Sequence, residues 1–368
     1  MNVRPQIAES GRSKALSVSL NQDNSCFAVG VDSGFYIYHS NPCTRQEAKN
    51  LEAGIGIVEM LGRSNFLALV GGGRAPKFPQ NKVVIWNDVK AITAFSLEFR
   101  SEIKAVRISR SRIIAVLLNS VHIYAFSQPP EKLHVFETYD NPLGLCALSA
   151  KTLAFPGRKA GYLQLFDLTS GNVTIIPAHT TPLAAINISP NGDLIATASE
   201  RGTLIRVYST ATSSMVAELR RGLDHATIFS LAISPSSRRL AVTSDKFTIH
   251  IFDLPSLSPS AIPIATVSSE NGSGVGISGA YGDNRKWGFL SKIPLLPKYF
   301  SSEWSFAHAT FDGGGRGCLG WTDEDTVVLI SAGEEEQAKW EKFVLVDGEI
   351  SGSLELHREG WRRYLDTE

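Results

Sequence analysis

The sequence has few cysteines, no excess of charge and no long apolar segment, and each lack excludes a class of protein. The four cysteines are scattered, without a Cys-x-x-Cys motif or paired Cys/His spacing. We therefore expect free thiols and no metal or cofactor site. Lys plus Arg and Asp plus Glu each number 36, which argues against a nucleic-acid-binding protein. No apolar run reaches about 18 residues, and the N-terminus lacks the apolar core of a secretory signal. These features predict a cytoplasmic protein.

A repeat pattern decides the expected architecture. Six segments share a run rich in Val, Ile, Leu, Tyr and Phe, then a turn, then a second such run containing an aromatic residue. The intervals between the last runs are about 38 to 48 residues, close to the length of a four-stranded propeller blade. The last runs begin at Phe35, Val83, Val121, Leu163, Ile205 and Ile249. The chain after about residue 300 ("WSFAHATF", "CLGWTD", "TVVLISA", "WEKFVLV") supplies strands for one further blade. We expect an all-β fold, a seven-bladed β-propeller of WD-repeat type, as a single domain over residues 1–368.

Motifs of catalysis are missing from the sequence. It contains no Gly-x-Ser-x-Gly elbow and no phosphate-binding Gly-x-x-x-x-Gly-Lys-Ser/Thr loop. The glycines at 71–73 are followed by Arg74 and Ala75, which indicates a turn. We therefore expect a binding protein rather than an enzyme. Because propeller folds serve many functions, the function has to come from particular sites.

Two adjacent arginines are the first candidate site. Arg220 and Arg221 lie in "AELRRGLDHATIF", residues 217–229. Successive side chains of an extended strand point to opposite faces. If the strand continues through both arginines, the two guanidinium groups serve different neighbours, which predicts one anion site on either side of the strand.

The same part of two consecutive repeats adds hydroxyl and basic side chains. Upstream of the arginines lie Thr197, Ser199, Thr203 and Arg206, and downstream lie Thr243, Ser244, Lys246, Thr248 and His250. Hydroxyl and guanidinium donors together suit phosphate oxygens. The alternative is that the arginines end a solvated strand and that the hydroxyls form hydrogen bonds within their own blades.

The combination of motifs resembles one family. Leu-Arg-Arg-Gly at 219–222, preceded by "ATASERGTLIRV" and followed by "SDKFTIHIF", resembles the signature of the PROPPIN family, the WIPI-type propellers that bind polyphosphoinositides. The resemblance extends over nearly the whole chain, including "LNQDNSCFAVGVDSGFYIY", "NKVVIWND" and "YFSSEWSF". The Leu form of the signature and the compact length are similar to the shorter branch of the family.

The resemblance implies two shallow sites for phosphatidylinositol 3-phosphate and phosphatidylinositol 3,5-bisphosphate. Site one is expected to contain Arg220, Arg206, Thr203, Ser199 and His179. Site two is expected to contain Arg221, Ser244, Lys246, Thr248 and His250, with His225 and Thr227 nearby. For His179 the alternative is a purely structural role, bracing its blade.

A long insert in blade six, about residues 255–303, is the third expected element. Its first half is rich in Ser, Gly and Pro, and its second half mixes lysines with large apolar side chains, a composition suited to lipid headgroups. The family resemblance implies that this loop enters the bilayer. The residues expected to insert are Lys286, Trp287, Phe289, Leu290, Ile293, Leu295 and Leu296. The segment "KYFSSEW" is expected to pack on the side of the propeller instead.

The resemblance also implies a cellular role. We expect a monomeric, non-enzymatic effector, peripheral on phagophore, endosomal or vacuolar membranes, that acts in autophagy and membrane traffic by recruiting partners. The implied partners are phosphoinositide-containing membranes and the autophagy lipid-transfer protein. Asn21 and Asp23 in "LNQDNS" are candidates for contacting that protein, although both residue types also form ordinary turns. Two alternatives stay open: a generic WD-repeat scaffold without lipid specificity, and a propeller enzyme.

Overall fold

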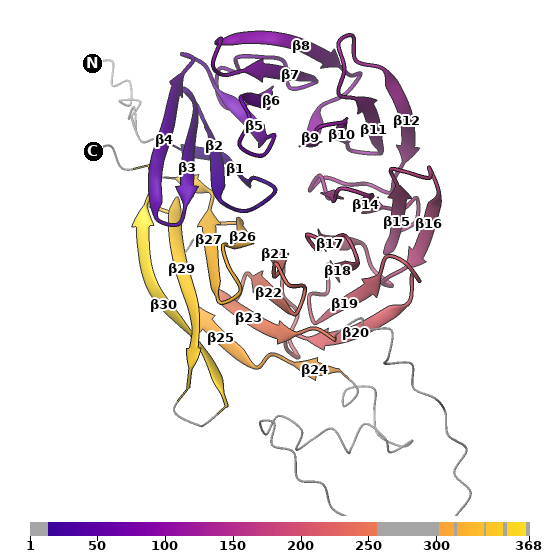
Figure 1. Ribbon diagram of the computed structural model, residues 1–368, viewed down its shortest axis with the longest axis vertical. Coiled ribbons are helices and arrows are strands. Elements are labelled where there is room, and N and C mark those ends of the chain that lie inside the picture. The colour runs from indigo at the N-terminus through magenta and orange to yellow at the C-terminus, as the bar shows by residue number, and fades with distance from the viewer. Residues whose placement is uncertain (1–13, 256–301, 313–314, 335, 349–351, 366–368) are drawn as a thin grey trace, which may run out of the picture.

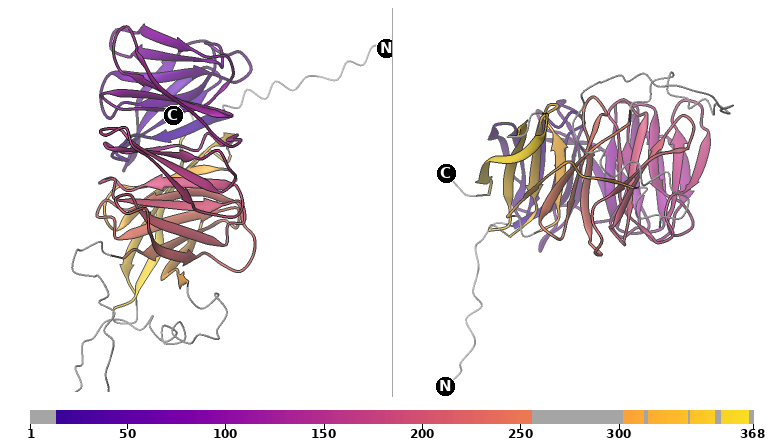
Figure 2. Two further views of the ribbon diagram at one scale, coloured as in Figure 1. Left: turned by 90° about the vertical axis from the view of Figure 1, so that its right-hand side faces the viewer. Right: turned by 90° about the horizontal axis from the view of Figure 1, so that it is seen from below.

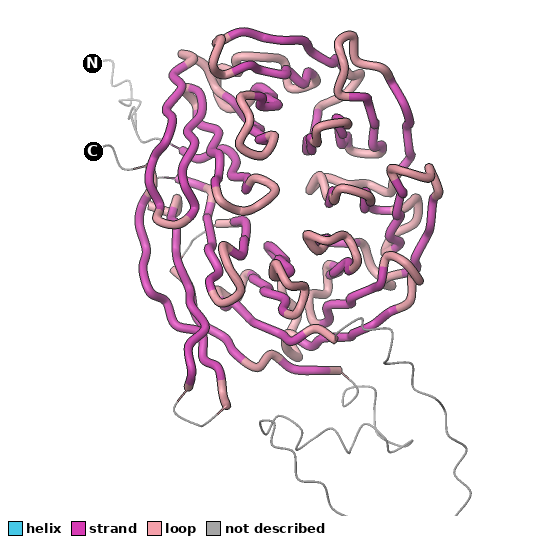
Figure 3. Tube along the Cα trace, in the orientation of Figure 1, coloured by secondary structure: helices cyan, strands magenta, loops and turns pink. Residues whose placement is uncertain are grey.

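The computed structural model describes residues 14–255, 302–312, 315–334, 336–348 and 352–365. Within these ranges the chain contains strands and turns and no helix. Seven sheets, each essentially one blade, are arranged around a central axis (Figure 1). Turns join the strands throughout the ring (Figure 3), and seen from the side the ring is a thick disc (Figure 2). The expected seven-bladed propeller is confirmed.

The first three blades each use four consecutive strands. Blade one contains β1 (Lys14–Leu20), β2 (Cys26–Val31), β3 (Gly34–Ser40) and β4 (Cys43–Asn50). Blade two contains β5 (Ile55–Met60), β6 (Phe66–Gly71), β7 (Lys82–Asn87) and β8 (Ile92–Glu98). Blade three contains β9 (Ile103–Ile108), β10 (Arg112–Leu117), β11 (Ser120–Ala125) and β12 (Lys132–Glu137).

Blades four to six continue this order, but blade six takes its outer strand from beyond the insert. Blade four contains β13 (Ala147–Leu148), β14 (Thr152–Pro156), β15 (Tyr162–Asp167) and β16 (Val173–Pro177). Blade five contains β17 (Leu183–Ile188), β18 (Leu194–Ser199), β19 (Leu204–Ser209) and β20 (Met215–Arg220). Blade six contains β21 (Ile228–Ile233), β22 (Arg239–Ser244), β23 (Thr248–Asp253) and β25 (Ala307–Thr310).

Blade seven is built from the C-terminal part of the chain. It contains β26 (Gly317–Trp321), β27 (Thr326–Ser331), β29 (Lys339–Asp347) and β30 (Leu354–Arg363). The segment "WSFAHATF" was expected to belong to this last blade, and that expectation was wrong. Its strand β25 pairs antiparallel with β23, because the insert separates the third and fourth strands of blade six.

Two very short strands join neighbouring parts of the ring. β24 (Glu303–Trp304) adds in parallel to the outer edge of β20, so "SSEW" lies against blade five. β28 (Gly333–Glu334) pairs with β1 and so connects blade seven to blade one.

Burial explains why the strands differ in sequence. The second strands of the blades are covered on both faces by neighbouring blades, and β18 and β22 are almost entirely buried. They therefore read as apolar runs with small hydroxyl residues rather than as alternating patterns. Outer strands such as β4 are mostly exposed and polar.

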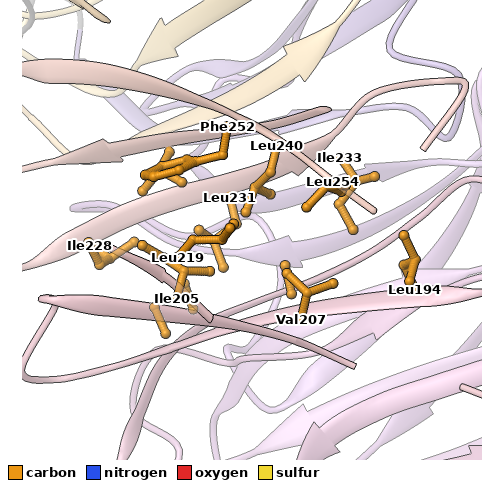
Figure 4. Packing of buried hydrophobic residues seen from close by; sticks show 14 residues of the cluster. Leu194, Ile205, Val207, Leu219, Ile228, Leu231, Ile233, Leu240, Phe252 and Leu254 are labelled. Carbon is orange, nitrogen blue, oxygen red and sulfur yellow. The ribbon is translucent and has the colours of Figure 1, made fainter. Parts of the chain in front are cut away.

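The core consists of seven apolar clusters in the described residues, one between each pair of adjacent blades. The cluster between blades five and six contains Ile205, Leu219, Leu240 and Phe252 (Figure 4). Radial stacking buries both faces of small sheets that would be unstable alone. Leu219, the residue before Arg220, belongs to this cluster, so the packing anchors the end of β20.

Candidate functional site

The two arginines stand where β20 ends. Arg220 is the last strand residue and lies opposite Leu204 of β19, whereas Arg221 follows the strand. The strand therefore does not continue through both residues, but the side chains still have different partners. Arg220 Nε donates to Ser302 Oγ at 2.8 Å. Arg221 Nε donates to the carbonyl of Gly202 at 2.9 Å, and its Nη2 donates to the carbonyl of Asp224.

Arg221 is a buried cation, with 7% of its surface exposed. Burial lowers the pKa of its guanidinium, and the nearby Asp245 and Asp224 act in the opposite direction. Its acceptor Gly202 has a φ of +61°, and a Cβ there would lie 1.7 Å from the carbonyl oxygen of Ala226. Only glycine permits this approach of the two loops. Arg221 thus fastens the β18–β19 loop to the β20–β21 loop as well as supplying charge.

The residues expected in site one gather between blades four and five. Ser199 ends β18 and is buried, Thr203 lies in the following loop, and Arg206 is in β19. Arg206 Nε donates to Glu218 Oε2 at 2.8 Å, and its Nη1 donates to the carbonyl of Ala178 at 2.7 Å. Glu218 lies opposite Arg206 in the β19–β20 register. Site one therefore contains a carboxylate that offsets part of its positive charge.

His179 has a clear structural role in this region. Its side chain is buried, and Nε2 lies 3.0 Å from Thr197 Oγ1 and 3.3 Å from the Thr197 carbonyl oxygen. Burial, together with the positive charge of Arg206, lowers its pKa to about 4. His179 is thus a neutral brace between blades four and five near neutral pH, as in the structural alternative.

The residues expected in site two lie on blade six and on the loop that leads into it. Ser244 ends β22, Lys246 is exposed in the next turn, and Thr248 and His250 are in β23. His225 and Thr227 are exposed in the β20–β21 loop, and the Thr227 carbonyl accepts a hydrogen bond from the amide of Asp245. The structure thus gathers the seven residues around the junction of blades five and six.

Both ring nitrogens of His250 have hydroxyl partners. Nε2 lies 3.1 Å from Thr248 Oγ1, and Nδ1 lies 3.0 Å from Ser305 Oγ. Burial, the charge of Arg221 and that of His308 lower its pKa to about 4. The ring is therefore neutral near pH 7, and His308 of β25 stacks on it with centroids 6.0 Å apart.

Sequence reasoning missed four residues that the structure adds to this region. Glu218 lies opposite Arg206 and two residues before Arg220. Ser302, Ser305 and His308 come from the part of the chain that follows the insert. The alternation along β20 could have revealed Glu218. The other three lie more than 50 residues from the side chains that they contact, and only the fold brings them there.

The remaining expected residues are differently placed. Asn21 is buried and its side chain bonds within its own turn and to the carbonyl of Gly62, whereas Asp23 is exposed and pairs with Arg63 at 3.8 Å. Asp23 is therefore the more accessible of the two partner candidates. The expected insertion residues, Lys286, Trp287, Phe289, Leu290, Ile293, Leu295 and Leu296, lie outside the described residues.

The described part of the molecule also has a cavity away from these residues. This cavity of about 300 Å³ lies among the loops of blades three to five, lined by residues including Tyr139, Leu143, Lys159 and Glu200, and it contains no candidate site residue. Within the described ranges, no group of three or more His, Cys, Asp or Glu side chains could hold a metal ion. The described part also has no helix long and apolar enough to cross a membrane.

The fold and these contacts define a seven-bladed propeller with clustered cations and hydroxyls at blades five and six. The PROPPIN family model matches residues 15–272. The SVP1-like protein 2 of Emericella nidulans is 51% identical over 327 residues, covering 84% of this chain and 99% of that protein. The chain therefore belongs to the PROPPIN family, whose members are known as autophagy-related, phosphoinositide-binding propellers.

Further comparisons agree with this assignment. Autophagy-related protein 18e of Arabidopsis thaliana is 33% identical over 325 residues, covering 86% of this chain and 81% of that protein. Kluyveromyces lactis Hsv2 superposes with a TM-score of 0.76 at 23% identity, covering 96% of this chain and 99% of that one. A second structure, KlAtg21 in complex with the coiled coil of AgAtg16, has a TM-score of 0.69 at 20% identity, covering 95% and 99%. At these identities the two structures support the fold alone.

Proposed function

We propose that the protein is a non-enzymatic effector of phosphatidylinositol 3-phosphate and phosphatidylinositol 3,5-bisphosphate. The observation that carries the proposal is the divergence of Arg220 and Arg221 at one strand end. Arg220 is two residues after Glu218, the partner of Arg206 in blade five, whereas Arg221 is near enough to Asp245 and His250 of blade six for their charges to interact. Serine and threonine residues lie in both blades, Ser199 and Thr203 in blade five and Ser244 and Thr248 in blade six. Hydroxyl and guanidinium donors together bind phosphate oxygens.

Two adjacent sites, one in blade five and one in blade six, suit a ligand that is part of a membrane. Each weak headgroup site alone gives marginal attachment, whereas simultaneous occupation raises avidity by roughly 10²–10⁴. The part of the insert from Lys286 to Leu296 is proposed to enter the bilayer beside these sites, while the end of the insert, at Ser302 and Glu303, stays packed on blade five. The protein would then lie edge-on and peripheral on phagophore, endosomal or vacuolar membranes as a monomer. There it would recruit partners in autophagy and membrane traffic, with the autophagy lipid-transfer protein contacting the region of Asp23.

Vesicle co-flotation of the purified chain at fixed salt tests the lipid proposal. Vesicles contain phosphatidylinositol, its 3-phosphate, its 3,5-bisphosphate or phosphatidylserine, and wild type is compared with Arg220→Thr/Arg221→Thr. The control is Arg45→Thr, an exposed arginine of blade one. We expect flotation only with the 3-phosphorylated lipids, lost in the double variant and kept in the control. Flotation that does not depend on the phosphates of the inositol ring would favour the alternative, a generic WD-repeat scaffold without lipid specificity.

A further inference from the structure

After the insert, the chain passes from the edge of blade five to blade six, the two blades that carry the candidate sites. We call Ser302–Ser305 the strap. Glu303 and Trp304 form β24 on the edge of β20, opposite Leu219 and Arg220. Immediately after the strap, the Phe306 amide donates to the Ile251 carbonyl at 3.0 Å, and Ala307 begins β25 of blade six. The strap is therefore fixed to blade five at one end and to blade six at the other.

The first serine of the strap contacts the cation of site one. Ser302 Oγ accepts from Arg220 Nε at 2.8 Å, and the serine is 7% exposed. A guanidinium group is planar, so a hydrogen bond at Nε fixes the plane in which its terminal nitrogens lie. That plane decides whether these nitrogens can bind two phosphate oxygens together.

The last serine of the strap contacts the imidazole of site two. Ser305 Oγ lies 3.0 Å from His250 Nδ1, while Thr248 Oγ1 lies 3.1 Å from Nε2. Because the partner of one ring nitrogen determines which nitrogen carries the proton, Ser305 influences both the orientation and the tautomer of the ring. Only two residues, Glu303 and Trp304, therefore separate the serine of site one from that of site two.

We propose that Ser302 and Ser305 are positioning residues that orient Arg220 and His250 for phosphate binding in two different sites. This inference rests on the proposed function. It extends that function by making the end of the insert part of both headgroup sites. Neither serine has to touch the lipid, since each acts through the side chain that it holds.

Double-mutant cycles test this assignment because they separate positioning from general damage. Ser302→Ala and Ser305→Ala are each made in wild type, in Arg220→Thr and in His250→Gln. Binding is titrated with phosphatidylcholine vesicles containing phosphatidylinositol 3-phosphate, at fixed pH and salt. Ser127→Ala is the control, since that serine bonds to Pro129 in distant blade three. Ser302→Thr and Ser305→Thr keep the hydroxyl, and thermal unfolding of every variant confirms that it folds.

In the otherwise wild-type protein, each serine-to-alanine substitution should weaken vesicle binding about 3- to 10-fold, the effect expected from losing one oriented hydrogen bond. The serine-to-threonine substitutions should restore most of the affinity. Ser302→Ala should have no further effect with Arg220→Thr but its full effect with His250→Gln. Ser305→Ala should show the reverse pattern. Unchanged affinity of both alanine variants, or equal effects in both backgrounds, would overturn the strap assignment alone. Wild type that does not prefer the 3-phosphate over phosphatidylinositol would overturn the proposed function and the strap with it.

Discussion

Arg220 and Arg221 are neighbours in sequence but differ in how much of the fold depends on them. Arg221 is buried and donates to the carbonyls of Gly202 and Asp224. Replacing it leaves the buried Gly202 carbonyl and the partly buried Asp224 carbonyl without their donor. Arg221→Thr should therefore lower the free energy of unfolding by about 1–3 kcal/mol, more than Arg220→Thr, which removes a donor to a single hydroxyl, that of Ser302. Urea unfolding of both single variants checks this, and equal stabilities would contradict the bracing role of Arg221.

The carboxylate of Glu218 gives a second prediction at residue scale. Glu218 accepts from Arg206 Nε and places a negative charge beside an expected anion site. Glutamine has the same shape and keeps an acceptor oxygen, so Glu218→Gln removes mainly the charge. We expect binding to 3-phosphorylated vesicles to strengthen about 2- to 5-fold at low salt, with less effect at high salt. Weaker binding would mean that site one depends on the ion pair.

The depressed pKa of His179 predicts how stability depends on pH. Its ordinary value of 6.5 is lowered to about 4 by burial in the native state. Below pH 6.5 the unfolded chain therefore binds a proton that the native chain does not, so stability falls as pH decreases from about 6.5 to 4. The loss for this residue is on the order of 2 kcal/mol at pH 5. In urea unfolding between pH 7.5 and 5, His179→Gln should show a smaller loss than wild type. An identical pH profile would contradict this cause.

At the scale of elements, β24 determines where one exposed tryptophan lies. Trp304 is 48% exposed and stands opposite Arg220 in the parallel register. Tryptophan is favoured where apolar and aqueous surroundings meet, as at a membrane surface. We expect Trp304→Ala to weaken vesicle binding about 3- to 10-fold, an effect of burying less apolar surface. Trp361→Ala, a similarly exposed residue of blade seven, is the control. Equal effects of the two substitutions would contradict the expectation that β24 lies at the membrane surface.

The elements also show which parts of the structure the sequence could predict. Seven repeated blades were predictable because each strand run is apolar over the length that neighbouring blades cover, as in β18 and β22. β24 was not, since a parallel pairing of two residues has no periodic pattern and depends on the insert ending beside β20. The burial of Arg221 could likewise not be predicted, because its carbonyl acceptors lie in two loops that only the tertiary fold brings together.

At the scale of the whole molecule, the described part of the ring closes without exchanging a long strand. Every main strand of blade one is N-terminal and every main strand of blade seven is C-terminal, and among the described residues only the short strand β28 joins β1. Side chains supply the rest of the junction. Trp340 Nε1 donates to the carbonyl of Ser40 at 2.7 Å, and Tyr38 Oη donates to the carbonyl of Tyr364 at 2.6 Å. The rings of Phe27, Tyr38 and Tyr364 pack beside them.

This closure predicts that small changes at the junction destabilise the propeller as a whole. Tyr38→Phe keeps the ring packing but removes the donor to a buried carbonyl, which should lower the free energy of unfolding by about 1–3 kcal/mol. Tyr162→Phe, at the half-buried start of β15 in blade four, should change it little. Hydrogen exchange should then show faster exchange in β1–β4 and β26–β30 before the rest, because opening begins where the two ends of the chain meet. Uniform acceleration around the ring would instead mean that all seven blade interfaces open together and that the junction is not the weakest of them.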